Sequence, residues 1–133
     1  MADERTQIVI ADDNLEILEA VKHILQEDFQ VIGAIDDAHY IVRAVSDLKP
    51  DVLILDISMS EFNGFEITQQ LKLQQCPSKI IFLTVHEELE FIRGAFDVGA
   101  SGYVFKSRMN TDLHAAINTV RGGGIFIPQA PIP

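Results

Sequence analysis

Two adjacent carboxylates, Asp12 and Asp13, directly follow the apolar run IVIA near the start of the chain, and a third, Asp56, directly follows the apolar run VLIL. Carboxylates that lie close together raise one another's pKa unless a cation compensates their charge. A hard divalent cation with oxygen ligands, Mg²⁺ above all, would compensate it. If the fold brings the three acids together, the sequence therefore predicts a magnesium site.

Two more polar residues stand at equivalent places. Thr84 follows the apolar run IIFL, and Lys106 follows the run YVF. A hydroxyl donor, an ammonium group and a metal ion together match what the three oxygens of a phosphoryl group require. Asp56, in the middle of this set, would be the nucleophile that accepts the group as an acyl phosphate.

Two simpler interpretations stay open at this point. In the first, Asp12 and Asp13 only cap the next helix, because negative charge is favoured at a helix N-terminus. In the second, Asp56 and Lys106 only form a buried ion pair beside Thr84, with a structural role. Polar residues follow four separate apolar runs in this way, and that coincidence favours the phosphoryl site.

The elements that must position these residues follow from the spacing of the apolar side chains. Nearly unbroken β-branched runs predict strands covered on both faces, at residues 7–11, 29–35, 51–55, 79–83 and 102–105. Steps of three and four residues predict helices at about 15–25, 38–48, 64–73 and 87–98, and a last helix capped by Thr111. Gly99 supplies the left-handed conformation that ends the fourth helix.

Strict alternation of five strands with five helices predicts an α/β fold, a doubly wound five-stranded parallel sheet with helices on both faces. Ligands of such folds bind outside the carboxyl ends of the strands, where the polar residues fall. The final stretch, RGGGIFIPQAPIP, is rich in glycine and proline. It predicts a linker or C-terminal tail over residues 122–133 rather than a sixth unit.

Length and composition limit the possible functions. The chain has 133 residues, enough for one domain with its own core. Its 20 acidic and 10 basic residues give a formal net charge of −10, which argues against direct binding to nucleic acid. The start, MADERTQ, has no signal-peptide pattern, and no apolar run reaches the roughly 20 residues that span a bilayer. We therefore expect a cytoplasmic protein with no membrane partner.

Taken together, the motifs resemble the receiver domain of two-component response regulators. The resemblance rests on the paired acids DD, on LILDISMSEFNGFE around Asp56, on FLTVHEE and on GASGYVFKS. The run from GASGYVFKS to GGGIFIP is most similar to the NarL/FixJ-type subfamily, whose members carry a helix-turn-helix DNA-binding domain after the receiver. This implies a flavodoxin-like fold with strand order 2-1-3-4-5, a receiver over residues 1–121, and a segment 122–133 that leads to a DNA-binding domain absent from this chain.

The resemblance also implies the roles of individual residues. Asp56 would receive a phosphoryl group from a histidine kinase. Mg²⁺ would be held by Asp12 or Asp13, with Asp13 the more direct ligand, by the side chain of Asp56 and by the backbone carbonyl of Ser58. One visible departure is Ser60, where the family usually has proline, so the loop after Asp56 is expected to be less rigid.

The resemblance also implies which residues would contact the phosphoryl group and which would control its release. Thr84 would bond one phosphoryl oxygen and Lys106 would pair with another. Tyr103 matches an aromatic position that swings inward when the threonine moves. Ser58 and His86 match variable positions that tune the lifetime of the acyl phosphate. That His86 screens or positions the hydrolytic water is a hypothesis, and an ordinary surface histidine is the alternative.

The function that this implies is a phosphorylation-operated switch. Phosphate on Asp56 would stabilise one of two conformations and alter the face of the fourth helix, fifth strand and fifth helix, with transcription as the expected output. The partners would be a histidine kinase, a second copy of the chain after phosphorylation, and DNA only through the missing domain. No turnover of an external substrate is expected. The alternatives are a stand-alone receiver that acts through protein contacts, and an aspartyl-nucleophile phosphatase, which would want a second acid where Ser58 stands.

Overall fold

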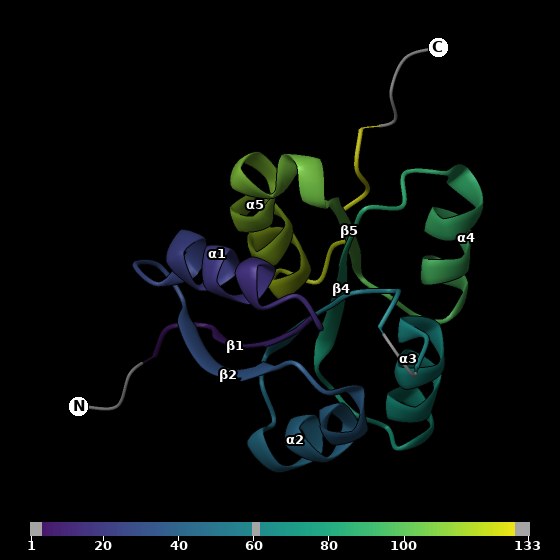
Figure 1. Ribbon diagram of the computed structural model, residues 1–133, viewed down its shortest axis with the longest axis horizontal. Helices are drawn as coiled ribbons and strands as arrows, with labels where there is room; N and C mark the ends of the chain where they lie inside the picture. The colour runs from purple at the N-terminus through teal and green to yellow at the C-terminus, as the bar shows by residue number, and fades with distance from the viewer. Residues whose placement is uncertain (1–3, 60–61, 130–133) are drawn as a thin grey trace.

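The computed structural model describes residues 4–59 and 62–129, so Ser60 lies outside the described residues. Figure 1 shows a central sheet with helices on both faces. The strands are β1 (Gln7–Ala11), β2 (Gln30–Ile35), β3 (Val52–Leu55), β4 (Lys79–Thr84) and β5 (Gly102–Phe105). The α-helices are α1 (Leu15–Leu25), α2 (Ile41–Leu48), α3 (Gly64–Leu73), α4 (Leu89–Asp97) and α5 (Met109–Arg121). Two short 3₁₀ helices are η1 (Ala38–Tyr40) and η2 (Lys106–Arg108).

The sheet is parallel throughout, and its strand order is β2-β1-β3-β4-β5. This confirms the predicted fold class and order. β3 and β5 are buried at every position, as expected for strands that helices cover on both faces. β2 differs from the prediction, because all its residues are partly or largely exposed. It lies at one end of the sheet and has one neighbouring strand, β1, whereas β5 at the other end is also flanked by Phe126.

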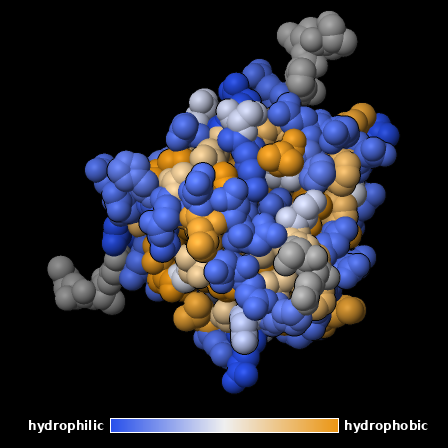
Figure 2. Space-filling model, in the orientation of Figure 1, coloured by the Kyte–Doolittle hydropathy of each residue, from blue (hydrophilic) through white to orange (hydrophobic). Residues whose placement is uncertain are grey.

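Two apolar cores lie on opposite faces of the sheet. Successive strand residues point to alternate faces, so Leu53 packs toward α2, α3 and α4 while Ile54 packs toward α1 and α5. On the face of the molecule in Figure 2, hydrophilic residues cover most of the surface and apolar residues show in small groups between them. No described helix is long and apolar enough to cross a bilayer.

Helix boundaries differ from the predicted ones at three places. The second predicted helix begins as η1 and continues as α2, and the fourth begins at Leu89. The prediction that Thr111 caps the last helix is wrong, because α5 begins at Met109 and places Thr111 inside its first turns. The chain already turns helically in η2, directly after β5, so the helix needs no cap farther on. Gly99 has a φ of +104°, which confirms its predicted role after α4.

In the described part of the stretch after α5, residues 122–129, one segment pairs with the sheet. Phe126 forms a parallel bridge with Gly102. The backbone N–H of Phe126 donates to the Ser101 carbonyl at 2.9 Å, and the N–H of Tyr103 donates to the Phe126 carbonyl at 3.1 Å. Part of the predicted tail therefore lies along the outer edge of β5. The domain boundary at residue 121 stays a prediction.

Gly64 offers a test of how tightly the loop after β3 packs. A Cβ at this position would lie 2.5 Å from the Asp56 carbonyl oxygen and 2.9 Å from a ring carbon of Phe82. We expect Gly64→Ala to lower the free energy of unfolding by about 1–3 kcal/mol through overpacking, measured by urea denaturation. At Gly122 the nearest atom would be 3.6 Å away, so Gly122→Ala is the matched control. Equal stability of the two variants would contradict this packing.

Candidate functional site

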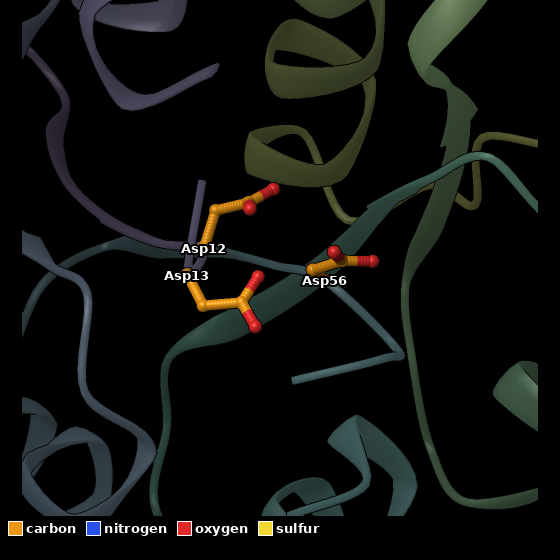
Figure 3. Close-up of side chains that lie close together, drawn as sticks. All are labelled: Asp12, Asp13 and Asp56. Atoms are coloured by element: carbon orange, nitrogen blue, oxygen red, sulfur yellow. The ribbon is translucent and has the colours of Figure 1, made fainter. Parts of the chain in front are cut away.

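The three predicted acids meet at the carboxyl ends of β1 and β3. One carboxylate oxygen from each of Asp12, Asp13 and Asp56 lies within 4.8 Å of the others. The backbone explains this, because the N–H of Asp56 donates to the Ala11 carbonyl at 3.1 Å and continues the pairing of the two strands. Figure 3 shows the side chains of Asp12 and Asp13 extending from the end of β1 toward Asp56. Asp12 and Asp56 are buried and Asp13 is exposed, so the cluster opens toward solvent at Asp13.

The ammonium group of Lys106 lies between two of these acids. Its Nζ is 2.8 Å from Asp12 Oδ2 and 3.1 Å from Asp56 Oδ2, to which it donates a hydrogen bond. With every group ionised, the three carboxylates and the one ammonium of the cluster sum to a charge of −2. A divalent cation would match that excess.

Burial and the neighbouring charges have opposing effects on the pKa of Asp56. Burial raises the pKa of its carboxyl, the charge of Lys106 lowers it, and the charge of Asp12 adds to the rise, so the net pKa is raised. Burial alone would lower the pKa of Lys106, but the carboxylates of Asp12 and Asp56 outweigh burial and raise it. The site therefore favours the charged form of Lys106 and disfavours the charged form of Asp56.

Neither Asp12 nor Asp13 is the N-cap of α1. Asn14 is the N-cap of α1, and its side chain accepts from the N–H groups of Glu16 and Ile17 at 2.9 and 3.3 Å. Asp12 supports this turn through one oxygen, because Oδ1 accepts from the N–H of Asn14 at 2.9 Å. Its other oxygen faces Lys106, so Asp12 serves both the turn and the cluster.

Thr84 ends β4 and is completely buried. It pairs with Phe105, the residue before Lys106, so the hydroxyl and the ammonium lie at the same edge of the sheet as the acids. The Thr84 hydroxyl oxygen accepts a hydrogen bond from the N–H of His86 at 3.3 Å. The predicted strand-end residues are thus all brought to one edge.

Ser58 and His86 meet beside this cluster. Ser58 Oγ and His86 Nε2 are 2.9 Å apart, within hydrogen-bond distance, and the Ser58 N–H donates to Asp56 Oδ1 at 3.4 Å. The imidazole stacks on the ring of Phe91 in α4, with centroids 4.1 Å apart and planes 12° from parallel. His86 is therefore fixed on two sides, unlike an ordinary surface histidine. Sequence reasoning missed Phe91, whose only signal was an aromatic residue in the first turns of the following helix.

Tyr103 points inward. Its side chain has no exposed area, and its hydroxyl donates to the backbone carbonyl of His86 at 2.7 Å. Burial raises the pKa of this phenol, and the nearby charges of Glu88, Asp56 and Glu87 act in the same direction. Tyr103 stays neutral and keeps its donor proton.

Comparison with known proteins finds similar transcriptional regulators. The transcriptional regulatory protein DegU of Brevibacillus brevis is 34% identical over 128 residues, which cover 94% of this chain and 54% of that protein. The oxygen regulatory protein NreC of Staphylococcus haemolyticus is 32% identical over 124 residues, which cover 91% of this chain and 57% of that protein. The chain therefore spans little more than half the length of these relatives.

Solved structures share the fold. The isolated receiver domain of RcsB from Salmonella enterica serovar Typhimurium, in the presence of the phosphomimetic BeF₃⁻, has a TM-score of 0.87 at 26% identity, with 96% of each chain covered. The receiver domain of the response regulator NarL from Mycobacterium tuberculosis has a TM-score of 0.85 at 24% identity, with 91% of this chain and 99% of that chain covered. This likeness confirms the flavodoxin-like receiver fold.

The family model for the response regulator receiver domain matches residues 8–118, nearly the whole of the described sheet and its helices. The chain belongs to the response regulator receiver domain family.

Proposed function

We propose that this chain is a phosphorylation-operated signalling switch in which Asp56 accepts a phosphoryl group from a histidine kinase with the help of Mg²⁺. The observation that carries the proposal is the convergence of three strand-end carboxylates within 4.8 Å, with the ammonium of Lys106 between two of them. The similar RcsB receiver, studied with a phosphomimetic, supports it.

The donor set fits a magnesium ion. Mg²⁺ prefers oxygen ligands and keeps several waters, and the cluster offers carboxylate oxygens on one side while Asp13 leaves it open to solvent on the other. We assign Asp13 and Asp56 as its carboxylate ligands, Ser58 as a backbone carbonyl ligand, and Asp12 as a ligand through water or directly. When bound, the ion compensates the charge of the acids and of the incoming phosphoryl oxygens.

The transfer follows from the positions of the side chains. A carboxylate oxygen of Asp56 forms the new bond to phosphorus, while the bond between phosphorus and the imidazole nitrogen of the kinase breaks and that nitrogen keeps the electron pair. Lys106 already contacts Asp56 Oδ2 at 3.1 Å, so its ammonium can pair with a phosphoryl oxygen added there. The Thr84 hydroxyl at the neighbouring strand end would donate to another.

The output of the switch follows from Thr84 and Tyr103. A bond from Thr84 to the phosphoryl group would alter the present hydrogen bond between Thr84 and the N–H of His86. It would thereby alter the position of the His86 carbonyl, which accepts a hydrogen bond from the Tyr103 hydroxyl. We propose that the face formed by α4, β5 and α5 changes in response. Because the relatives are transcriptional regulators of greater length, we propose control of transcription in the cytoplasm, with a second copy as partner after phosphorylation and with DNA bound only by a further domain.

Two other functions are less well supported. A stand-alone receiver that acts through protein contacts would use the same site, and the similarity to transcriptional regulators is what favours control of transcription over it. A phosphatase with an aspartyl nucleophile would want a second acid two residues beyond Asp56, where Ser58 stands and bonds His86 instead. We therefore expect no turnover of an external substrate.

The phosphoacceptor assignment predicts a mass change. Incubation with Mg²⁺ and acetyl phosphate should add one phosphoryl group to the unaltered chain, detected by intact mass spectrometry. Asp56→Asn should remove the gain, because an amide is no nucleophile for phosphorus. Asp47→Asn is the matched control, since the Asp47 side chain is 71% exposed and lies on α2. A phosphorylated Asp56→Asn chain would contradict the assignment.

The contact of His86 with Ser58 predicts an effect on the phosphorylated state. If the imidazole screens the acyl phosphate from water, His86→Ala should shorten its lifetime severalfold, measured by the loss of phosphoryl mass after the donor is removed. His23→Ala, on the exposed side of α1, should leave the lifetime unchanged. An unaltered lifetime in His86→Ala would end the screening hypothesis and leave the phosphoacceptor assignment intact.

A further inference from the structure

The segment after α5 behaves as a short edge strand. Along residues 125–129 the side chains alternate between outside and inside, with Ile125 and Ile127 61% and 65% exposed and Phe126 and Pro128 turned inward. Phe126 packs against the apolar core under α1 and α5. Figure 1 shows this segment, in yellow, beside β5. The alternation is that of a strand despite the flanking glycines and prolines.

Among the described residues, one pair of backbone hydrogen bonds joins this segment to β5. The N–H of Phe126 donates to the Ser101 carbonyl and the Phe126 carbonyl accepts from Tyr103. Continued parallel pairing would need a donor at position 128, and Pro128 has none. The edge strand can therefore detach by a local opening that leaves the rest of the sheet folded.

The segment is attached to the backbone of Tyr103, and the side chain of Tyr103 links β5 to the candidate site. The Tyr103 hydroxyl donates to the carbonyl of His86 at 2.7 Å, and the N–H of His86 donates to the Thr84 hydroxyl at 3.3 Å. Three consecutive hydrogen bonds thus join Phe126 to Thr84 through Tyr103 and His86. Detachment of the segment removes the hydrogen bond that holds the Tyr103 backbone in place.

We propose that the edge strand at residues 125–127 is a regulatory element that holds Tyr103 in its buried position and thereby raises the affinity of the Asp56 site for a phosphoryl group. The inference rests on the proposed function of Asp56 and adds the tail as a regulator of it. Coupling between two sites is reciprocal. A ligand that mimics the phosphoryl group must therefore tighten the edge strand by the same factor by which the strand tightens the ligand.

The test compares two proline substitutions in the full chain. Phe126→Pro removes the N–H that bonds Ser101 together with the ring that packs against the core. Ile125→Pro alters an exposed neighbour whose N–H, by the alternation of a strand, faces away from β5. With Mg²⁺ present, BeF₃⁻ affinity is measured by calorimetric titration. Phe126→Pro should weaken binding by about fivefold or more, and Ile125→Pro by no more than about twofold. Equal affinity of Phe126→Pro and the unaltered chain would overturn the inference.

A second measurement needs no variant and decides the case if Phe126→Pro does not fold. Hydrogen exchange of the Tyr103 amide in the unaltered chain should slow by about fivefold or more when BeF₃⁻ and Mg²⁺ saturate the site, beyond any change at the Ile10 amide in β1. A Tyr103 amide that responds no more than Ile10 would overturn the inference. Failure of the unaltered chain to bind BeF₃⁻ would instead refute the proposed function, and the inference with it.

Discussion

The contact of one ammonium group with two buried carboxylates is the interaction on which the rest of the site depends. Lys106 lies 2.8 Å from Asp12 and 3.1 Å from Asp56, and both acids are almost completely buried, at 2% and 6% exposed. Carboxylates so far from water are costly unless paired. One ammonium group compensates only one of these two charges, and Asp13 adds a third carboxylate to the cluster. The net negative charge of the cluster would suit a divalent cation, which in turn would compensate the charge of an incoming phosphoryl group.

The sheet makes this arrangement unavoidable once its strand order is set. β1 and β3 are neighbours, so the residues that follow them must meet, and β4 and β5 bring Thr84 and Lys106 to the same edge. The apolar runs before these residues pack on both faces and hold the strand ends in fixed positions. Gly64 adds to this rigidity, because its missing side chain lets α3 begin against the Asp56 backbone. A site built on such strand ends is held more precisely than one on free loops.

The apolar runs were sufficient to predict the strands and the placing of the acids, Thr84 and Lys106 at one edge, because such runs report burial and parallel strands end together. The order of the strands came from the resemblance to receiver domains and not from the runs themselves. The sequence did not predict contacts that depend on three-dimensional neighbours. The stacking of His86 on Phe91 and the pairing of Phe126 with β5 join residues through geometry that no periodicity records. The cap assigned to Thr111 failed for a related reason, since the 3₁₀ turn after β5 started the helix earlier than local propensity indicates.

The most direct test of the central claim is a calorimetric titration of the chain with Mg²⁺. We predict one ion bound per chain, and an affinity lower by at least about tenfold in Asp13→Asn, since a carboxylate ligand is lost. Asp36→Asn, which removes an exposed charge after β2, should bind as the unaltered chain does. Absence of Mg²⁺ binding by the unaltered chain, or equal affinity in Asp13→Asn, would contradict the account.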